Sequence, residues 1–227
     1  MVMAKIRLTA KIRRSYREDL KTLNDKVRTM GSLVKCAIND AVRSLVDRDV
    51  DLAAGVLRRD DEINAIELDI EKRCINLIML QQPMATDLRM VVTSLKIITD
   101  LDRIADLAAN IAQLVREMEN EEMVKPLIDI PRMSELAQQM VEMSIKSFTE
   151  KDVSLAEGLK IKDDELDALF DQVFRELLAY MTVDYSAVPN GYHLLLIARY
   201  LERIGDHACN IGGRVIYMVT GKRRKIA

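Results

Sequence analysis

The chain of 227 residues is 49% apolar and 31% charged, and its formal net charge is −2. This balance gives no reason to expect nucleic-acid binding, and the apolar fraction is sufficient for a packed core. Gly occurs eight times, Pro four times and Trp not at all. Strand-rich proteins of this size need many turns, so the low counts of Gly and Pro favour an all-α fold with a few long helices.

Cys36, Cys74 and Cys209 show no metal-type spacing, which predicts reduced thiols. The sequence has neither an apolar signal core nor a stretch of about 18 apolar residues, so we expect a cytoplasmic protein. Both ends are basic: residues 1–17 carry six Lys or Arg without an acid, and 221–225 reads GKRRK. Such ends suit either solvated termini or contact with an anionic membrane surface or acidic partner.

The first half of the sequence predicts three helices. Apolar residues recur every three or four positions over about 16–49, which is the spacing of an amphipathic helix. Asp51 is the expected N-cap of a second helix. Pro83 suits the first turn of a third helix over about 83–121, and Asp87 suits the positive charge of its start.

A segment with two prolines, 121–133, separates the halves. Pro131 suits the start of a fourth helix that reaches Lys151. Ser154 and Glu157 predict a capping box ahead of a fifth helix.

The sixth helix is expected over about 192–220, with Gly221 ending it. The short connections require antiparallel neighbours. We therefore expect six long antiparallel helices in two tandem three-helix bundles. Residues 1–122 would form the first repeat with a basic N-terminal extension, and 123–227 the second with a basic C-terminal tail.

An internal repeat supports this division. LDRIADLAANI at 101–111 returns as LERIGDHACNI at 201–211, and residues 50–66 match 153–169. Two copies of one three-helix unit are the simplest explanation of these matches.

Each copy of the repeat places two carboxylates four residues apart, Asp102 with Asp106 and Glu202 with Asp206. At about 100° per residue, these side chains fall nearly opposite the apolar stripe, so we expect them on a face that points away from the core. Two like charges at this spacing repel by about 0.2–0.5 kcal/mol, and folding does not require them. Rows of oxygen ligands suit a hard divalent cation, iron or manganese.

The preceding helix of each half offers further polar side chains at helical spacing: Asp60, Asn64 and Glu67, then Asp163, Asp167 and Asp171. Antiparallel packing of the two helices would line one groove with both rows. Two alternatives stay open at this point. The rows could form a solvated charged face with Arg103 and Arg203 as partners, or they could reflect a tandem duplication with little divergence.

No catalytic motif accompanies these rows. The only histidines are His193 and His207, and the sequence contains no P-loop, GxGxxG or HExxH. His207 corresponds to Leu107 in the first repeat, so a chemistry shared by both repeats cannot require it.

The phrase QQPMATDLRMVV at 81–92, with the two copies at 101–111 and 201–211, resembles signatures of the PhoU family of phosphate-signalling proteins. RTMG at 28–31 and the DDEIN/DDELD pair also fit, and the similarity runs in order over about 16–217. The resemblance implies a cytoplasmic accessory of the high-affinity phosphate ABC transporter that negatively regulates phosphate uptake and the phosphate-starvation response, and that is not an enzyme. The implied partners are the transporter's ATPase subunit, a membrane sensor histidine kinase and a second copy of the chain, with membrane contact only through these partners.

Some members of that family bind iron or other metals through paired E/D-x-x-x-D motifs. The metal-ligating residues that the resemblance implies are Asp102, Asp106, Glu202 and Asp206, with Asp60 and Asp163 as further ligands. It leaves open whether the metal is Fe, Mn, Zn or Mg. The first repeat has Asp102 and Ala105 where the family usually has Glu and Gly, so the second site is the stronger expectation. The alternatives are a helical metallohydrolase acting on a phosphate compound, through clustered carboxylates that hold metals, and a metal-free helical scaffold.

Overall fold

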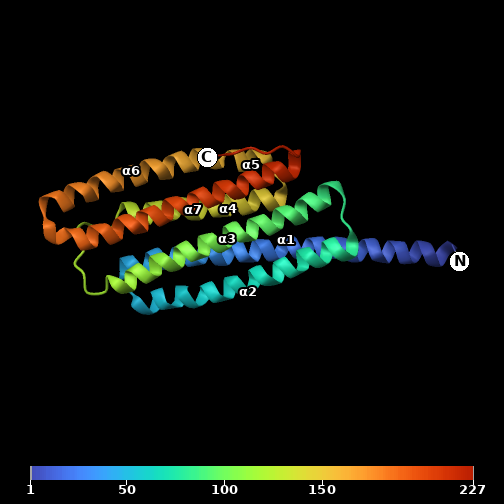
Figure 1. The fold of residues 1–227 in the computed structure, drawn as a ribbon, viewed down its shortest axis with the longest axis horizontal. Helices are drawn as coiled ribbons and strands as arrows, with labels where there is room; N and C mark the ends of the chain where they lie inside the picture. The colour runs from blue at the N-terminus through green and yellow to red at the C-terminus, as the bar shows by residue number, and fades with distance from the viewer. Residues whose placement is uncertain (1, 227) are drawn as a thin grey trace.

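The computed structural model describes residues 2–226, with side chains from Tyr16 onward, and contains only helices, turns and loops over that range. The long helices are α1 (Val2–Asp47), α2 (Val50–Gln81), α3 (Ala85–Glu117), α4 (Asp129–Glu150), α6 (Leu159–Val183) and α7 (Val188–Thr220), with a short α5 (Val153–Glu157) and a 3₁₀ turn, Tyr185–Ala187. Successive long helices run in opposite directions (Figure 1). The predicted all-α fold of two tandem three-helix units is confirmed.

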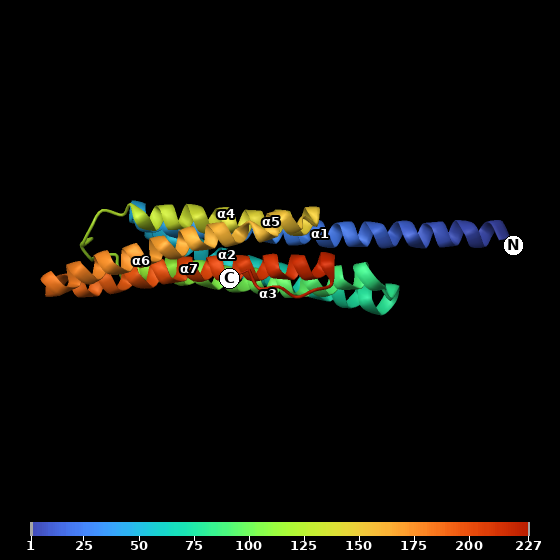
Figure 2. The same ribbon diagram turned by 90° about the horizontal axis from the view of Figure 1, so that it is seen from above.

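The two units lie side by side with their helices roughly parallel to one long axis (Figures 1 and 2). Helices α1, α2 and α3 contact one another, as do α4, α6 and α7, and the units meet where α1 packs on α4 and α3 on α7. One apolar core runs through both units. The repeated residues Leu101 and Leu201 are completely buried in it, as the helical spacing predicts. Since the core is shared, a domain boundary at residue 122 stays a prediction.

Two predicted helix starts are wrong by a few residues. Asp49, rather than Asp51, caps α2, because its extended backbone lets the carboxylate accept a hydrogen bond from the Leu52 amide at 2.8 Å. Pro83 precedes α3 instead of lying in its first turn, and Met84 occupies the N-cap position. The neighbouring acids still favour the positive helix starts, because Asp51 lies in the first turn of α2.

The predicted capping box of Ser154 and Glu157 is also wrong. Asp152 caps this segment, accepting a hydrogen bond from the Leu155 amide at 3.0 Å. Glu157 instead forms an ion pair with Arg224 of the C-terminal tail, at 2.7 Å. The cap of this helix is therefore Asp152, two residues before the predicted cap Ser154.

The two ends of the chain differ from expectation in different ways. Helix α1 begins at Val2 instead of near Tyr16 and extends beyond the rest of the bundle (Figure 1). The basic side chains expected within residues 1–15 lie outside the described part of the structure. Gly221 ends α7 as predicted, with a φ of 74° that glycine adopts without strain. Within residues 2–226, none of the helices has the length and apolar character that a membrane span needs.

Candidate functional site

The first carboxylate cluster lies between α2 and α3. It consists of Asp60 and Glu67 on α2 and Asp102 and Asp106 on α3. Burial raises the pKa of Asp60, and the charges of Asp106 and Asp102 raise it further. Burial also raises the pKa of Glu67, with Asp102 as the next cause. The acids of α2 and α3 therefore lie close enough to influence one another electrostatically, and a groove between the two helices stays a prediction.

Two oxygens of this cluster have no hydrogen-bond partner among the described residues. Asp60 Oδ1 and Asp102 Oδ1 are buried without a hydrogen bond from any described residue. An unsatisfied buried polar group costs about 1–3 kcal/mol, so folding alone gives no reason to keep these carboxylates. Asp106 differs, because it accepts a hydrogen bond from Arg103 at 2.9 Å on the more exposed side. The solvated-face alternative thus suits Asp106 but does not explain Asp60 and Asp102.

The second cluster repeats the arrangement between α6 and α7, with Asp163, Asp167, Glu202 and Asp206. Asp163 is only 3% exposed, and burial followed by the charge of Asp167 raises its pKa. Burial, followed by the charge of Asp206, also raises the pKa of Asp167.

Glu202 uses its two oxygens differently. Its Oε1 accepts a hydrogen bond from Arg199 at 2.6 Å, whereas Oε2 is buried and finds no partner among the described residues. Burial is the main reason that the pKa of Glu202 is raised. Each cluster therefore contains at least one buried carboxylate oxygen that is free to accept a cation.

A lysine distinguishes the second cluster from the first. Lys160 Nζ lies 2.9 Å from Asp164 and 3.9 Å from Asp163, and the matching position in the first repeat is Leu57. Lys160 is not among the residues predicted from the sequence, although its position three residues before Asp163 on a helix indicates a contact between the two side chains. Lys160 partly neutralises the second cluster and would compete with a bound cation for Asp163.

The expectation that these acids point away from the core is wrong in part. Asp206 is exposed, but Asp102 and Glu202 are half-buried and Asp163 is buried. The reason is that the helical wheel places a side chain relative to its own helix only, whereas α2 and α6 cover one flank of the acidic rows. The structure thus brings the predicted residues together in two clusters, one in each repeat.

The donor set of both clusters fits a hard cation, because it consists of carboxylate oxygens and includes unpaired ones. As the side chains are placed, however, the described residues contain no group of three or more His, Cys, Asp or Glu that could hold a metal ion. Rotation of the carboxylates toward a shared point would be needed. The predicted ligand set stays a prediction.

Comparison with known proteins identifies the family. A sequence model described as "PhoU domain" matches residues 27–115 and 130–215, one match in each repeat. The chain belongs to the PhoU family. A relative from Aquifex aeolicus named "Phosphate-specific transport system accessory protein PhoU homolog" is 40% identical over 205 residues, covering 90% of this chain and 93% of the relative. A protein of the same name from Zymomonas mobilis is 36% identical, covering 92% of this chain and 89% of the relative.

Two solved structures have the same fold. The crystal structure of PhoU from Pseudomonas aeruginosa is 34% identical with a TM-score of 0.86, and the match covers 91% of this chain and all of that one, 100%. The phosphate transport system regulatory protein PhoU from Streptococcus pneumoniae is 27% identical with a TM-score of 0.86, over 92% of this chain and 99% of that one. The PhoU fold therefore extends over nearly the whole molecule.

Proposed function

We propose that this PhoU-family protein is a cytoplasmic regulatory accessory of a phosphate-specific transport system, which restrains phosphate uptake and phosphate-starvation signalling. The observation that carries the proposal is the match to PhoU accessory proteins through both repeats, 27–115 and 130–215. The proposed partners are the transporter's ATPase subunit, a sensor histidine kinase where one is present, and a second copy of the chain.

The two carboxylate clusters would hold metal ions in this role. In the first repeat Asp60, Asp102 and Asp106 would bind the cation, and in the second Asp163, Glu202 and Asp206. A bound cation would supply positive charge to the unpaired oxygens of Asp60, Asp102 and Glu202. Oxygen-only ligands favour magnesium, manganese or iron over zinc, which prefers nitrogen and sulfur. The chain's own residues would then fasten α2 to α3 and α6 to α7.

The side chains that a partner could cover lie at the two ends of the bundle. Met84, between α2 and α3, is 82% exposed, and Val183, the last residue of α6, and Tyr185, just before α7, are each 89% exposed. Exposed apolar side chains that gather on a surface indicate a contact site, and each end has such a group: Met79, Leu80 and Met84 at one, Val183 and Tyr185 at the other. These residues are therefore the first positions to substitute when partner binding is mapped.

Co-purification tests the accessory role directly. The full-length protein is immobilised and mixed with the ATPase subunit of the phosphate transporter, with manganese or with EDTA. We expect recovery of the ATPase subunit, and weaker recovery for Met84→Asp or Tyr185→Asp. The matched control is Glu62→Gln, an exposed charge on α2 outside both clusters and both apolar ends. Failure to recover the ATPase subunit with or without metal would contradict the accessory role.

A further inference from the structure

The C-terminal tail folds back along α7 instead of leaving the bundle (Figure 1). Gly221 reverses the chain, and Ile226 then packs against Gly212 so closely that a Cβ at position 212 would lie 2.6 Å from Ile226 Cδ1. A Cβ on Gly213 would lie 2.9 Å from the carbonyl oxygen of Arg224. Two adjacent glycines in α7 thus provide the room in which the tail lies.

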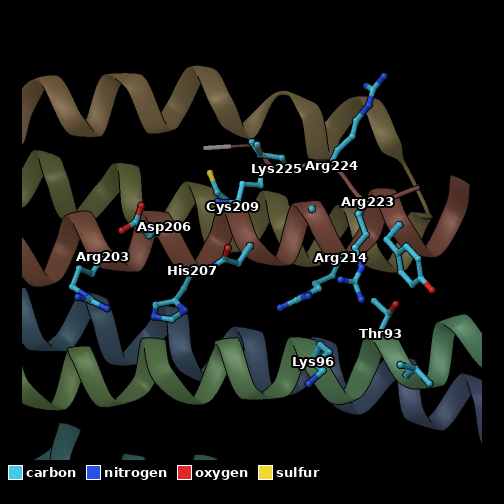
Figure 3. A pocket seen from close by; sticks show the side chains of 15 residues that line it. Thr93, Lys96, Arg203, Asp206, His207, Cys209, Arg214, Arg223, Arg224 and Lys225 are labelled. Atoms are coloured by element: carbon cyan, nitrogen blue, oxygen red, sulfur yellow. The ribbon is translucent and has the colours of Figure 1, made fainter. Parts of the chain in front are cut away.

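The returning tail closes one side of a pocket of about 700 Å³ whose other walls are α3 and α7 (Figure 3). The cations that line it are Lys96, Arg203, Arg214, Arg223, Arg224 and Lys225. Figure 3 shows Arg203 and Arg214 reaching from α7 toward the α3 side, with Arg223 of the tail descending into the same space. Helix α3, helix α7 and the tail that follows α7 therefore bring their positive charges to one cavity.

Most of these cations have no ion-pair partner among the described residues. Arg224 pairs with Glu157, but the other five cations of the pocket form no ion pair within the described part of the chain. Among the described residues of the lining, Asp206 is the only acid, and Figure 3 shows it turned away from the neighbouring Arg203. Like charges gathered in a concave site repel each other, and the cavity focuses their field on whatever enters it.

The chemistry of the lining narrows the class of ligand. Guanidinium groups pair with phosphate and carboxylate oxygens in a bidentate geometry. Five cations without an ion pair among the described residues favour a ligand with several negative charges, as linked phosphate groups carry. Ligand pockets for small molecules measure about 300–1,000 Å³, so this cavity has room for much more than one phosphate ion. Tyr217 adds a half-buried aromatic wall beside the cations.

We infer that the pocket binds a small anion that carries two or more linked phosphate groups, such as an inorganic oligophosphate or a nucleoside polyphosphate. Arg214 of α7 and Arg223 of the tail donate hydrogen bonds to the phosphate groups, and Lys96 of α3 adds a third positive charge beside them. The site forms only when the tail lies against Gly212 and Gly213 of α7. The site uses residues outside the carboxylate clusters, apart from Asp206 at its edge, so it does not depend on metal binding.

Calorimetric titration of the full-length protein tests the inference. Tripolyphosphate and ATP serve as probes, in buffer with EDTA and with about 0.15 M salt, at which exposed charges are screened beyond about 8 Å. We expect saturable binding of at least one probe. Arg214→Gln and Arg223→Gln should each weaken it by about tenfold or more, because each removes a charge-assisted hydrogen bond. Both residues are exposed, so neither change should prevent folding.

Two further variants separate a built site from general charge attraction. Gly213→Ala keeps every charge but displaces the tail at Arg224, so it should weaken binding as well. Arg175→Gln removes an exposed arginine of α6 far from the pocket and should leave the affinity unchanged. Equal affinity for both probes would show that the phosphate chain alone is recognised, and tighter binding of ATP would assign the site to nucleotides.

Three results would overturn the inference. The first is absence of saturable binding of both probes at millimolar concentration. The second is equal weakening by Arg175→Gln and Arg214→Gln, which would indicate unspecific attraction. The third is binding to phosphatidylserine-containing vesicles without binding of either small anion, because the basic tail would then serve a membrane surface. As EDTA is present throughout, none of these results depends on whether the carboxylate clusters hold metal.

Discussion

His207 Nδ1 lies 3.1 Å from Asp100 Oδ1, and this contact joins the last helix of one repeat to the last helix of the other. Both side chains are largely buried, with exposed fractions of 19% and 13%. The corresponding positions in the other repeat are Leu107 and Tyr200. The polar contact therefore breaks the internal symmetry where α3 packs on α7.

The His207–Asp100 contact should stabilise the packing of the two repeats. A double-mutant cycle with His207→Gln and Asp100→Asn should give a coupling energy of about 0.5–1.5 kcal/mol, the range of a partly buried hydrogen bond. Urea unfolding measures it. The exposed pair Arg43–Asp47 on α1 is the control and should couple by no more than about 0.5 kcal/mol. Equal coupling energies in both cycles would show that the His207–Asp100 contact stabilises the protein no more than an exposed ion pair does.

Asp60→Asn should raise the free energy of unfolding of the metal-free protein by about 0.5–1 kcal/mol, because it removes a like charge from the first cluster. Burial and the charges of Asp106 and Asp102 raise the pKa of Asp60, so the folded state disfavours its charged form. The destabilisation is fully present above the raised pKa, decreases as the pH falls from the raised to the ordinary carboxyl pKa, and is absent below that. Chemical denaturation at pH 7 in EDTA measures the change.

Asp69→Asn, on the same helix, is the matched control with the opposite sign. Hydrogen bonds from Arg73 and Lys26 lower the pKa of Asp69, so its contribution stabilises the fold above the ordinary carboxyl pKa and is lost as the pH falls through the lowered pKa. Asp69→Asn should lower the free energy of unfolding at pH 7. If both variants change stability in the same direction, the electrostatic account of the first cluster is wrong.

Gly205→Val should destabilise the second repeat by about 1–3 kcal/mol, the usual cost of overpacking. A Cβ on Gly205 would lie 2.6 Å from Leu166 Cδ2, and Leu166 is completely buried. Gly55→Val is the control, because its Cβ would meet nothing nearer than Arg58 Nη2 at 3.8 Å; it should change stability by no more than about 0.5 kcal/mol. Thermal unfolding measures both variants. Equal losses of stability in Gly205→Val and Gly55→Val would contradict the close contact between Gly205 and Leu166.

One thiol should react quickly with a disulfide reagent in the native protein. Cys36 is exposed, whereas Cys74 and Cys209 are buried. Burial and the charge of Glu71 raise the pKa of Cys74 to about 12, and burial followed by the charge of Asp163 raises that of Cys209. Since the thiolate is the reactive form, both should react only on unfolding. Cys36→Ser should abolish the fast phase, and a fast reaction that persists in this variant would contradict the buried placement.

The sequence predicted the helices and the repeat well, because apolar spacing acts locally and strongly along each helix. It located the caps less precisely, since Asp49 and Asp51 are both good candidates and only the backbone conformation decides between them. The orientation of Asp102 and Glu202 depends on which neighbour covers them, which a single helical wheel does not contain. The basic pocket depends on a chain reversal at Gly221 and on room at Gly212 and Gly213, and these are tertiary relationships.

The most direct test of the central claim, that the two carboxylate clusters bind metal ions, is elemental analysis. The full-length protein is incubated with iron, manganese, zinc or magnesium, desalted and measured beside Asp60→Asn, Asp102→Asn, Glu202→Gln and the control Glu62→Gln. We expect metal to remain on the unsubstituted protein and on Glu62→Gln, and to decrease in the three cluster variants. Absence of retained metal, or equal retention in every variant, would contradict the claim.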